Sequence, residues 1–394
     1  MKRWFRGLLI CSLIVAWLIP AEGLAAAAVE DFKKDTSVGV RAAESLSQVT
    51  GIAISPLLGV GAMGAYKYYR TKPEDRGRLS WYAQPWFWTV ALTIVGVCLL
   101  KDSLGPAIPT SLKKPFDVLE LFENKASAII ATGAIIPIAA EVFEQLKPNL
   151  SSQLDLAGLH FAAVGLHSLG DVIMIPLALV IYAVVWLVSH TINVLVLVSP
   201  FTTVDTVLKS FRTTVLASVV GTQFLDERLG AAWALIIFLL CLLLAPWAFR
   251  TVVFGTVFAW DILTFRRMRF SPSPSGNWMF TAQKIGQAPH RAFGILSRKT
   301  DGNLVFSWRP WLILPARMEI LPPGQYVIGR GLIHSEILRV EGEHAPDIFN
   351  LPPRCNQHED ALAALYQFTE VRPIGLRAAW AWLKELFLAR PALA

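Results

Sequence analysis

The chain has 394 residues, of which 54% are hydrophobic and only 16% charged, and its net charge is +7. Soluble domains usually carry about a quarter charged residues, so this composition excludes an ordinary soluble protein and predicts a membrane protein. The positive charge gathers beside apolar segments, in Lys67 to Arg78 and in Arg266 to Arg269. Such clusters are typical of cytoplasmic loops rather than of nucleic-acid contacts. We therefore expect the lipid bilayer as a partner, and no nucleic acid.

The N-terminus predicts a secretory signal peptide over residues 1–28. A basic start, MKRWFR, precedes an apolar core from Leu8 to Pro20, and small residues at Ala25 to Ala27 suit a cleavage site. The alternative is an uncleaved anchor helix, although the apolar core is short for a span. The polar residues that follow, 29–48, predict an external amphipathic segment.

A helical membrane domain is predicted over 49–265. Apolar segments near 49–66, 86–100, 126–140, 172–189 and 231–249 predict about five spans, which place both basic clusters in the cytoplasm. The loop 101–125 would then lie outside with four lysines, against the positive-inside rule, unless part of it re-enters the bilayer. We expect a multi-pass protein of the bacterial cytoplasmic (inner) membrane with a cytoplasmic C-terminus.

A small β-rich domain is predicted to follow the membrane domain. The stretch SPSPSGN ends a basic and Ser/Pro linker at 266–276, and the β-rich domain covers 277–375. Asp301-Gly302 predicts a hairpin turn, and LPPGQYVIGRG predicts another turn and another strand. A helix is expected at 357–369. Residues 376–394 predict an amphipathic helix, which lies on the membrane surface or packs on the β domain.

One unit of sequence occurs twice in the membrane domain. In each copy Pro-Phe precedes an Asp, and a Gly follows that Asp by sixteen residues: Asp117 with Gly133, and Asp205 with Gly221. Both Asp residues are placed to cap the start of a helix, which is their structural explanation. The short apolar runs that follow, interrupted by glycine, resemble the broken helices of transporters, whose backbone dipoles hold ions at membrane depth. These four residues are the predicted transport or ion site.

A second candidate is a polar stripe in AGLHFAAVGLHSLGD. His160, His167 and Asp171 share one face of a helix at 3.6 residues per turn. The stripe suits a proton relay or a metal, because histidine titrates near neutrality and carboxylates orient it. The alternative is an interfacial helix whose polar face lies in water.

Other polar residues have structural explanations. Asp261 precedes the cluster at Arg266 and is expected to pair with it, while Arg250 ends an apolar run and is expected to reach the interface. In the β-rich domain, histidines and Cys355 are too scattered to predict a zinc site. Because no catalytic motif, cofactor motif or metal motif is found, we expect no enzyme and no cofactor.

The membrane half resembles a family of uncharacterised bacterial membrane proteins, the domain of unknown function 4126. The resemblance covers about 45–260 and rests on the stretches ISPLLGVGAMGA, QPWFW, KDSLGPAIP with PFDVLE, and VSPFTTVDTVLKS. It implies a polytopic bacterial membrane protein and no known activity.

Three functional hypotheses follow. In the first, a small solute or ion moves through a site between the two repeated helical units. In the second, the membrane half is an anchor or scaffold, and the cytoplasmic β-rich domain binds a protein or lipid partner. In the third, the stripe of His160, His167 and Asp171 performs intramembrane chemistry on a lipid.

Overall fold

The computed structural model describes residues 38–104, 123–138, 163–199, 202–331, 334–340, 345–375 and 377–378. The predicted signal peptide, 1–28, and nearly all of the predicted C-terminal helix, 376–394, lie outside these residues. The chain divides into two compact units. The first comprises Met1–Gly96, Ser127–Val185 and Thr213–Leu239, and the second Val97–Ala126, Trp186–Arg212 and Leu240–Ala394.

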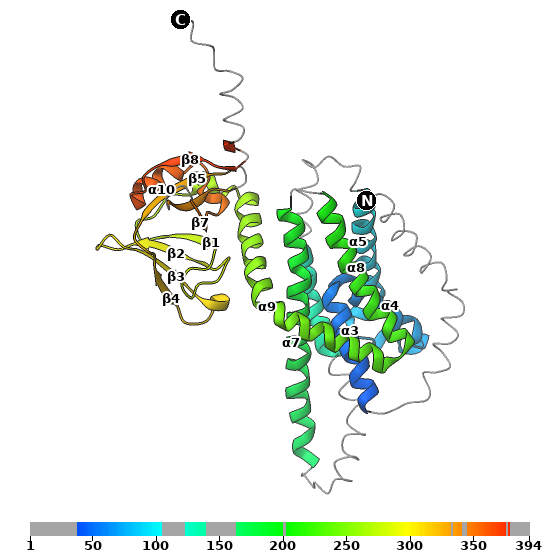
Figure 1. The fold of residues 1–394 in the computed structure, drawn as a ribbon. Coiled ribbons are helices and arrows are strands. Elements are labelled where there is room, and N and C mark those ends of the chain that lie inside the picture. Colours follow the sequence, from blue (N-terminus) through cyan, green and yellow to red (C-terminus); the bar gives the residue numbers. More distant parts are fainter. Residues whose placement is uncertain are drawn as a thin grey trace, which may run out of the picture. The chain divides into compact units, whose positions relative to one another are not determined.

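The protein is mostly helical, with a mixed β-sheet near its C-terminus (Figure 1). Residues 123–138 are helical as well. The other long helices are α3 (Val38–Ile54), α4 (Pro56–Arg70), α5 (Pro85–Leu104), α7 (Ala163–Val198), α8 (Thr202–Leu225) and α9 (Glu227–Leu263).

A break at Ser55 divides the first predicted span, 49–66, between α3 and α4. Ser55 has φ -139° and ψ 86°, because the ring of Pro56 disfavours the helical conformation in the residue before it. Gly64 then brings α4 close to the short helix η3 (Trp81–Ala83). A Cβ atom at Gly64 would stand 2.1 Å from the carbonyl oxygen of Tyr82. The segment is therefore two helical pieces where we expected one continuous span.

Two described helical segments are long and apolar enough to cross a membrane by length and composition: Ile175–Val198 and Arg228–Leu263. They contain most of the predicted spans near 172–189 and 231–249. The predicted span 86–100 falls in α5, whose apolar part, Pro85–Cys98, is shorter. Within the described residues, two candidate spans therefore stand where the sequence predicted about five.

The C-terminal domain is an eight-stranded sheet in the order β4-β3-β2-β1-β7-β6-β5-β8. Neighbouring strands are antiparallel, except that β5 and β8 run parallel. Figure 1 shows α10 (Glu359–Tyr366) beside β5 and β8. The strands are β1 (Asn277–Thr281), β2 (Phe293–Arg298), β3 (Leu304–Trp308), β4 (Arg317–Ile320), β5 (Gln325–Arg330), β6 (Glu336–Val340), β7 (Asp347–Asn350) and β8 (Val371–Pro373).

Alternating apolar residues of these strands build one hydrophobic core. Met279, Leu296, Phe306 and Phe349 are fully buried in it, and α10 adds Leu362. Side chains on one face of a strand repeat every two residues, so strand pairing brings these positions to the same side of the sheet. The C-terminal domain therefore has a core of its own.

The predicted hairpin turn is confirmed. Asp301 and Gly302 connect β2 to β3, which pair in antiparallel register from Arg298 with Leu304 onward. Gly302 has φ +85°, a conformation that glycine adopts without strain. The Asp301 carboxylate accepts hydrogen bonds from the backbone N–H and side-chain amide of Asn303, each at 3.0 Å. A further strand, β5, begins directly after the predicted LPPG turn.

Candidate functional site

The four residues of the predicted transport site do not fall in one described unit of the structure. Asp117 lies outside the described residues. Gly133 and Gly221 belong to the first unit and Asp205 to the second, so neither unit by itself contains the predicted site. In the predicted polar stripe, His160 also lies outside the described residues, whereas His167 and Asp171 fall in α7, of which only the backbone is described at those positions.

The two glycines do not break their helices. Gly133 lies within the helical residues 123–138 and Gly221 within α8, and helical structure continues on both sides of each. A Cβ at Gly221 would meet nothing within 4 Å, and one at Gly133 would meet the ring of Trp81 at 3.7 Å. A single glycine in a helix costs only about 1 kcal/mol relative to alanine, which the neighbouring turns tolerate. The expectation of glycine-broken helices is therefore wrong at both positions.

Asp205 does not stand at the N-cap position of its helix. Helix α8 begins at Thr202, so Asp205 lies inside its first turn, where a carboxylate favours the positive end of the helix dipole. Its residue surface is only 3% exposed. An aspartate that does cap a helix is Asp226, directly before α9, whose carboxylate accepts hydrogen bonds from the backbone N–H of Arg228 at 2.8 Å and of Leu229 at 3.0 Å. The sequence pattern placed a cap where the structure has a buried carboxylate.

A buried polar cluster surrounds His190 in the second unit. The His190 Nδ1–H donates to Oδ1 of Asn124 at 2.9 Å, and the imidazole stacks on Trp186 with ring centroids 5.0 Å apart. His190 is 1% exposed, and its Nε2 atom has no hydrogen-bond partner among the described residues. The bonded Nδ1 makes Nε2 the free acceptor of this ring.

Further polar contacts extend this cluster. The ammonium of Lys125 donates to the hydroxyl of Thr256, which in turn donates to the carbonyl of Val252 at 2.6 Å. Arg212 donates to Oδ1 of Asn193 at 2.9 Å. Polar side chains within apolar helices are costly and usually serve a purpose, because lipid offers them no hydrogen bonds. His190 is not among the residues predicted from the sequence, although a lone histidine inside an apolar run is a visible signal.

The C-terminal half of α9 is joined to the sheet by a junction that we call the α9–sheet junction. Its apolar part is a group of phenylalanines: Phe280 of β1 lies 5.0 Å from Phe254 and 6.1 Å from Phe258, measured between ring centroids. All three side chains are buried in one cluster. Aromatic pairs at such spacings contribute more than their buried area alone.

The polar part of the α9–sheet junction is a buried ion pair. Nε of Arg354 lies 2.6 Å from a carboxylate oxygen of Asp261, and both side chains are almost fully buried. Arg266 lies 3.8 Å from the same carboxylate, so the predicted pairing with the basic cluster is present. The nearer partner is nonetheless Arg354, which lies 93 residues further along the chain. A second contact joins the same regions, because His358 donates to the backbone carbonyl of Arg267 at 2.8 Å.

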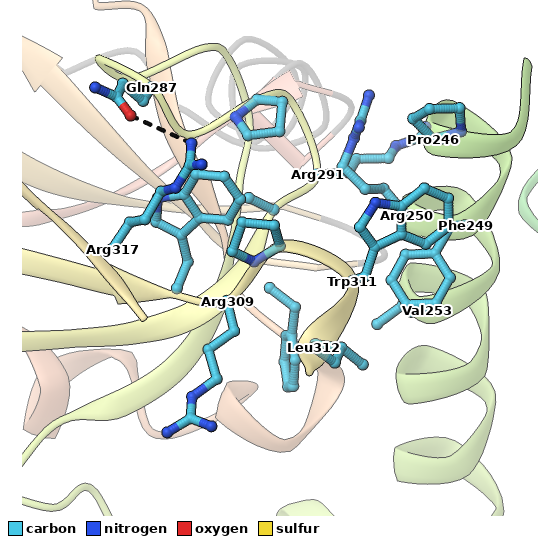
Figure 2. A pocket seen from close by; sticks show the side chains of 15 residues that line it. Pro246, Phe249, Arg250, Val253, Gln287, Arg291, Arg309, Trp311, Leu312 and Arg317 are labelled. Atoms are coloured by element: carbon cyan, nitrogen blue, oxygen red, sulfur yellow. Dashed lines mark hydrogen bonds between the residues drawn. The ribbon is translucent and has the colours of Figure 1, made fainter. Parts of the chain in front are cut away.

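A pocket of about 190 Å³ lies beside this junction, and we call it the arginine pocket (Figure 2). Its walls come from α9, from the turn between β1 and β2, and from β3, β4 and the loop between them. No acidic residue is among the described residues that line it. The lining includes Pro246, Phe249, Arg250, Val253, Gln287, Arg291, Trp308, Arg309, Trp311, Leu312 and Arg317.

Three of the pocket arginines are held by neutral partners. Arg250 donates to the carbonyl of His290 at 2.9 Å, and Arg291 donates to the hydroxyl of Thr251 at 3.2 Å. Arg317 donates to the side-chain oxygen of Gln287 at 3.2 Å. Figure 2 shows that the Arg309 side chain extends away from these three. None of the four forms an ion pair within the part of the chain that the structure describes.

The electrostatic consequence is a positive potential in the arginine pocket. Burial lowers the pKa of Arg291 below its usual value. Burial and the guanidinium groups of Arg291 and Arg250 also lower the pKa of His290, against an opposing effect of Asp347. A carboxylate outside the lining, that of Glu319, accepts a hydrogen bond from the backbone N–H of Gln287 at 2.9 Å. The pocket therefore favours an anionic occupant.

The backbone of the pocket is strained at three residues. Arg291, Trp311 and Leu312 have φ angles of 59°, 53° and 63°, in the left-handed region that side chains with a Cβ rarely adopt. Each such residue costs on the order of 1–3 kcal/mol and persists only where its surroundings impose it. The Trp311 ring contacts Phe249 of α9, with centroids 4.8 Å apart. Strain of this kind often accompanies a functional site.

The loop after β3 exposes a run of apolar side chains. Trp311, Leu312, Ile313 and Leu314 are all exposed, Ile313 to 83%. Strand β3 ends at Trp308, and the short helix η6 (Pro310–Leu312) follows it. A proline cannot donate to a strand ladder, which explains why pairing stops there. A consecutive rather than alternating apolar run was the signal that this stretch is not an ordinary strand.

Within the described residues, no group of three or more His, Cys, Asp or Glu side chains is placed to hold a metal ion. Comparisons of the chain with protein-family models, with curated proteins and with solved structures found no match. The resemblance over about 45–260 stays a prediction, and the functional inference depends on this chain's own residues.

Proposed function

We propose that the protein is a membrane anchor and scaffold of the bacterial cytoplasmic membrane, whose C-terminal β domain binds a lipid or protein partner at the cytoplasmic surface. The observation that carries the proposal is the α9–sheet junction. Its aromatic cluster and its buried Asp261–Arg354 pair fix the sheet to a helix that is long and apolar enough to cross a membrane. A domain fixed in this way is held at a defined height above the bilayer.

The proposed topology has about five spans, a cleaved signal peptide, and both basic clusters in the cytoplasm. Activity-dependent reporters fused after Arg78 and after Arg269 should behave as cytoplasmic, and one inserted at Val40 as external. Reporters at positions 40 and 78 on the same side of the membrane would contradict this topology. A reporter after Arg269 on the outer side would remove the cytoplasmic β domain from the proposal.

The binding role is tested by photocrosslinking in intact cells. A photoreactive amino acid replaces Ile313 on the exposed loop or Ile320 on the edge strand β4, and Thr300 in the β2–β3 turn serves as the control position. We expect a discrete lipid or protein adduct from positions 313 and 320 and none from position 300. Absence of an adduct at both positions, in chains that are correctly inserted, would overturn the scaffold proposal.

A second candidate function is movement of a small solute or ion through the helical domain. The observations that favour it are the buried carboxylate of Asp205 and the buried cluster of His190 with Asn124. Buried ionisable groups between apolar helices mark ion or proton paths in many membrane proteins. Asp117, Gly133 and Gly221 remain proposed members of the site, and the proton or metal stripe of His160, His167 and Asp171 remains a separate proposal.

The transport candidate is tested by proton flux into proteoliposomes that contain the full-length chain and a pH-sensitive dye. The Asp205→Asn and Asp117→Asn variants remove a charge and keep the side-chain shape. Loss of flux in these variants, with unchanged thermal stability, supports transport. Flux equal to that of protein-free liposomes in the wild-type chain, or unaltered flux in both variants, speaks against a proton path through these residues.

A further inference from the structure

We infer that the arginine pocket binds the phosphate of an acidic phospholipid headgroup, with Arg250, Arg291 and Arg317 as its ligands. The inference rests on the proposed function, because it names the partner of the membrane-anchored β domain. Three features carry it: the positive charge of the pocket, which has no ion-pair partner among the described residues, its rigid construction, and its position at the end of the uncharged stretch of α9.

The charge of the pocket selects an anion. Three guanidinium groups face it with only neutral hydrogen-bond partners, and its described lining contains no carboxylate. A guanidinium presents several N–H donors in one plane and suits phosphate oxygens, with which it forms charge-assisted hydrogen bonds. A positively charged headgroup such as choline would meet repulsion here, so the pocket favours a headgroup with net negative charge.

The size of the pocket limits what enters it. Pockets for whole small-molecule ligands have volumes of about 300–1,000 Å³, whereas the arginine pocket has about 190 Å³. It therefore accepts a group the size of a phosphate with part of its glycerol, and the rest of the ligand must lie outside. A phospholipid meets this condition, because its acyl chains remain in the bilayer.

The rigid construction of the pocket suits recognition. Arg250 and Arg291 are anchored across the gap between α9 and the β1–β2 turn, each to a partner on the other element. Arg291 also lies over the ring of Phe254, 5.0 Å from its centroid. Side chains held in this way lose little further freedom on binding, which strengthens their affinity.

The position of the pocket along α9 favours a lipid over a soluble anion. No charged residue lies between Arg228 and Arg250, and this stretch of helix is about 30 Å long, which is the thickness of the hydrocarbon core. Arg250 is therefore expected at the level of the headgroups. The exposed Trp311, Ile313 and Leu314 lie in the adjoining loop, where tryptophan and aliphatic side chains suit the membrane interface.

The experiment uses the full-length chain in a neutral detergent. Its thermal unfolding is followed while one of four probes is added: dihexanoyl phosphatidylglycerol, dihexanoyl phosphatidylcholine, glycerol 3-phosphate or inorganic phosphate. We expect phosphatidylglycerol to raise the unfolding temperature at lower concentration than any other probe. Equal responses to both phospholipids would overturn the selection by charge. Equal responses to phosphatidylglycerol and to inorganic phosphate would overturn the lipid as the ligand.

Variants locate the site. The variants Arg317→Gln, and Arg317→Gln combined with Arg291→Gln, should need a roughly tenfold or higher phosphatidylglycerol concentration for the same rise in unfolding temperature. The reason is that each substitution removes a charge-assisted hydrogen bond to the phosphate. One control keeps the response: Arg372→Gln on β8, which removes an exposed arginine that does not line the pocket. An unchanged response in both pocket variants overturns the inference. Protein adducts from Ile313 together with an absent lipid response would leave the scaffold in place and remove only the lipid.

Discussion

Two neighbouring regions of the second unit differ in the partners of their arginine side chains. In the α9–sheet junction, Arg354 is buried and lies 2.6 Å from the carboxylate of Asp261. In the arginine pocket, Arg250, Arg291 and Arg317 have only neutral partners. A charge that is buried with its counterion belongs to the fold, because removing either partner leaves an uncompensated charge. A charge held in place without a counterion remains available to a ligand.

The largest expected effect comes from breaking the buried pair. Arg354→Gln leaves the Asp261 carboxylate buried with only the distant Arg266, so the free energy of unfolding should fall by about 3–5 kcal/mol. Thermal unfolding of the full-length chain in detergent measures the loss, and proteolysis within 266–276 should become faster. Arg372→Gln, which removes an exposed pair with Glu370, should change stability by less than about 1 kcal/mol. Equal losses in the two variants would contradict the comparison.

Alkaline pH should weaken the C-terminal domain. Burial raises the pKa of the Cys355 thiol to about 12 and that of the Tyr366 hydroxyl to about 12, from usual values of 9.0 and 10.0. The protonated thiol of Cys355 therefore contributes stability that is complete below pH 9 and is lost as the pH rises from 9 towards 12. Unfolding measured against pH should show a shallower alkaline decline in Cys355→Ala, and an identical decline would contradict a protonated, buried thiol.

A smaller effect is expected in the arginine pocket. Arg317 is exposed and lacks an ion-pair partner among the described residues, so Arg317→Gln should change the free energy of unfolding by no more than about 0.5 kcal/mol without lipid. Thermal unfolding in lipid-free detergent checks this value against Arg354→Gln. A loss comparable to that of Arg354→Gln would make Arg317 a structural residue and would remove the distinction between the two regions.

The smallest effect concerns the strained loop. At φ 63°, Leu312 gains from replacement by glycine, which adopts this conformation freely but costs entropy in the unfolded chain. Leu312→Gly should therefore leave the stability of the lipid-free chain unchanged or raised, within about 1 kcal/mol. A decrease well beyond that range would show that the Leu312 side chain is itself a stabilising contact of the loop.

Local features were predictable because their causes are local. The Asp301-Gly302 turn follows from two adjacent residues, and β5 follows the LPPG turn directly. The candidate span in α9 follows from an uninterrupted apolar run. The break at Ser55 was also a local signal, since Pro56 is visible in the sequence, but apolar composition alone suggested one continuous span.

The candidate sites were not predictable in the same way. The pocket joins Arg250 to Arg317 and the junction joins Asp261 to Arg354, across 67 and 93 positions of the chain. No periodicity connects such residues, because their proximity depends on where the β1–β2 turn and the loop after β3 meet α9. The repeated Asp and Gly pattern is a local signal, yet it led to wrong expectations. It suggested caps and breaks, whereas the structure continues both helices through the glycines and buries Asp205 in the first turn.

The sequence by itself determined the two apolar stretches that are long enough to cross a membrane, the β-rich nature of the last part of the chain, and the turn chemistry of the β2–β3 hairpin. These depend on composition and on neighbouring residues, where hydrophobicity and φ/ψ preference act directly. Only the tertiary structure decided which charges are paired. Whether an arginine meets a carboxylate is a matter of distances between elements that are remote in the chain, and electrostatic energy depends on those distances and on burial. Arginine therefore forms a buried ion pair at position 354. At positions 250, 291 and 317 it lines the pocket with neutral hydrogen-bond partners.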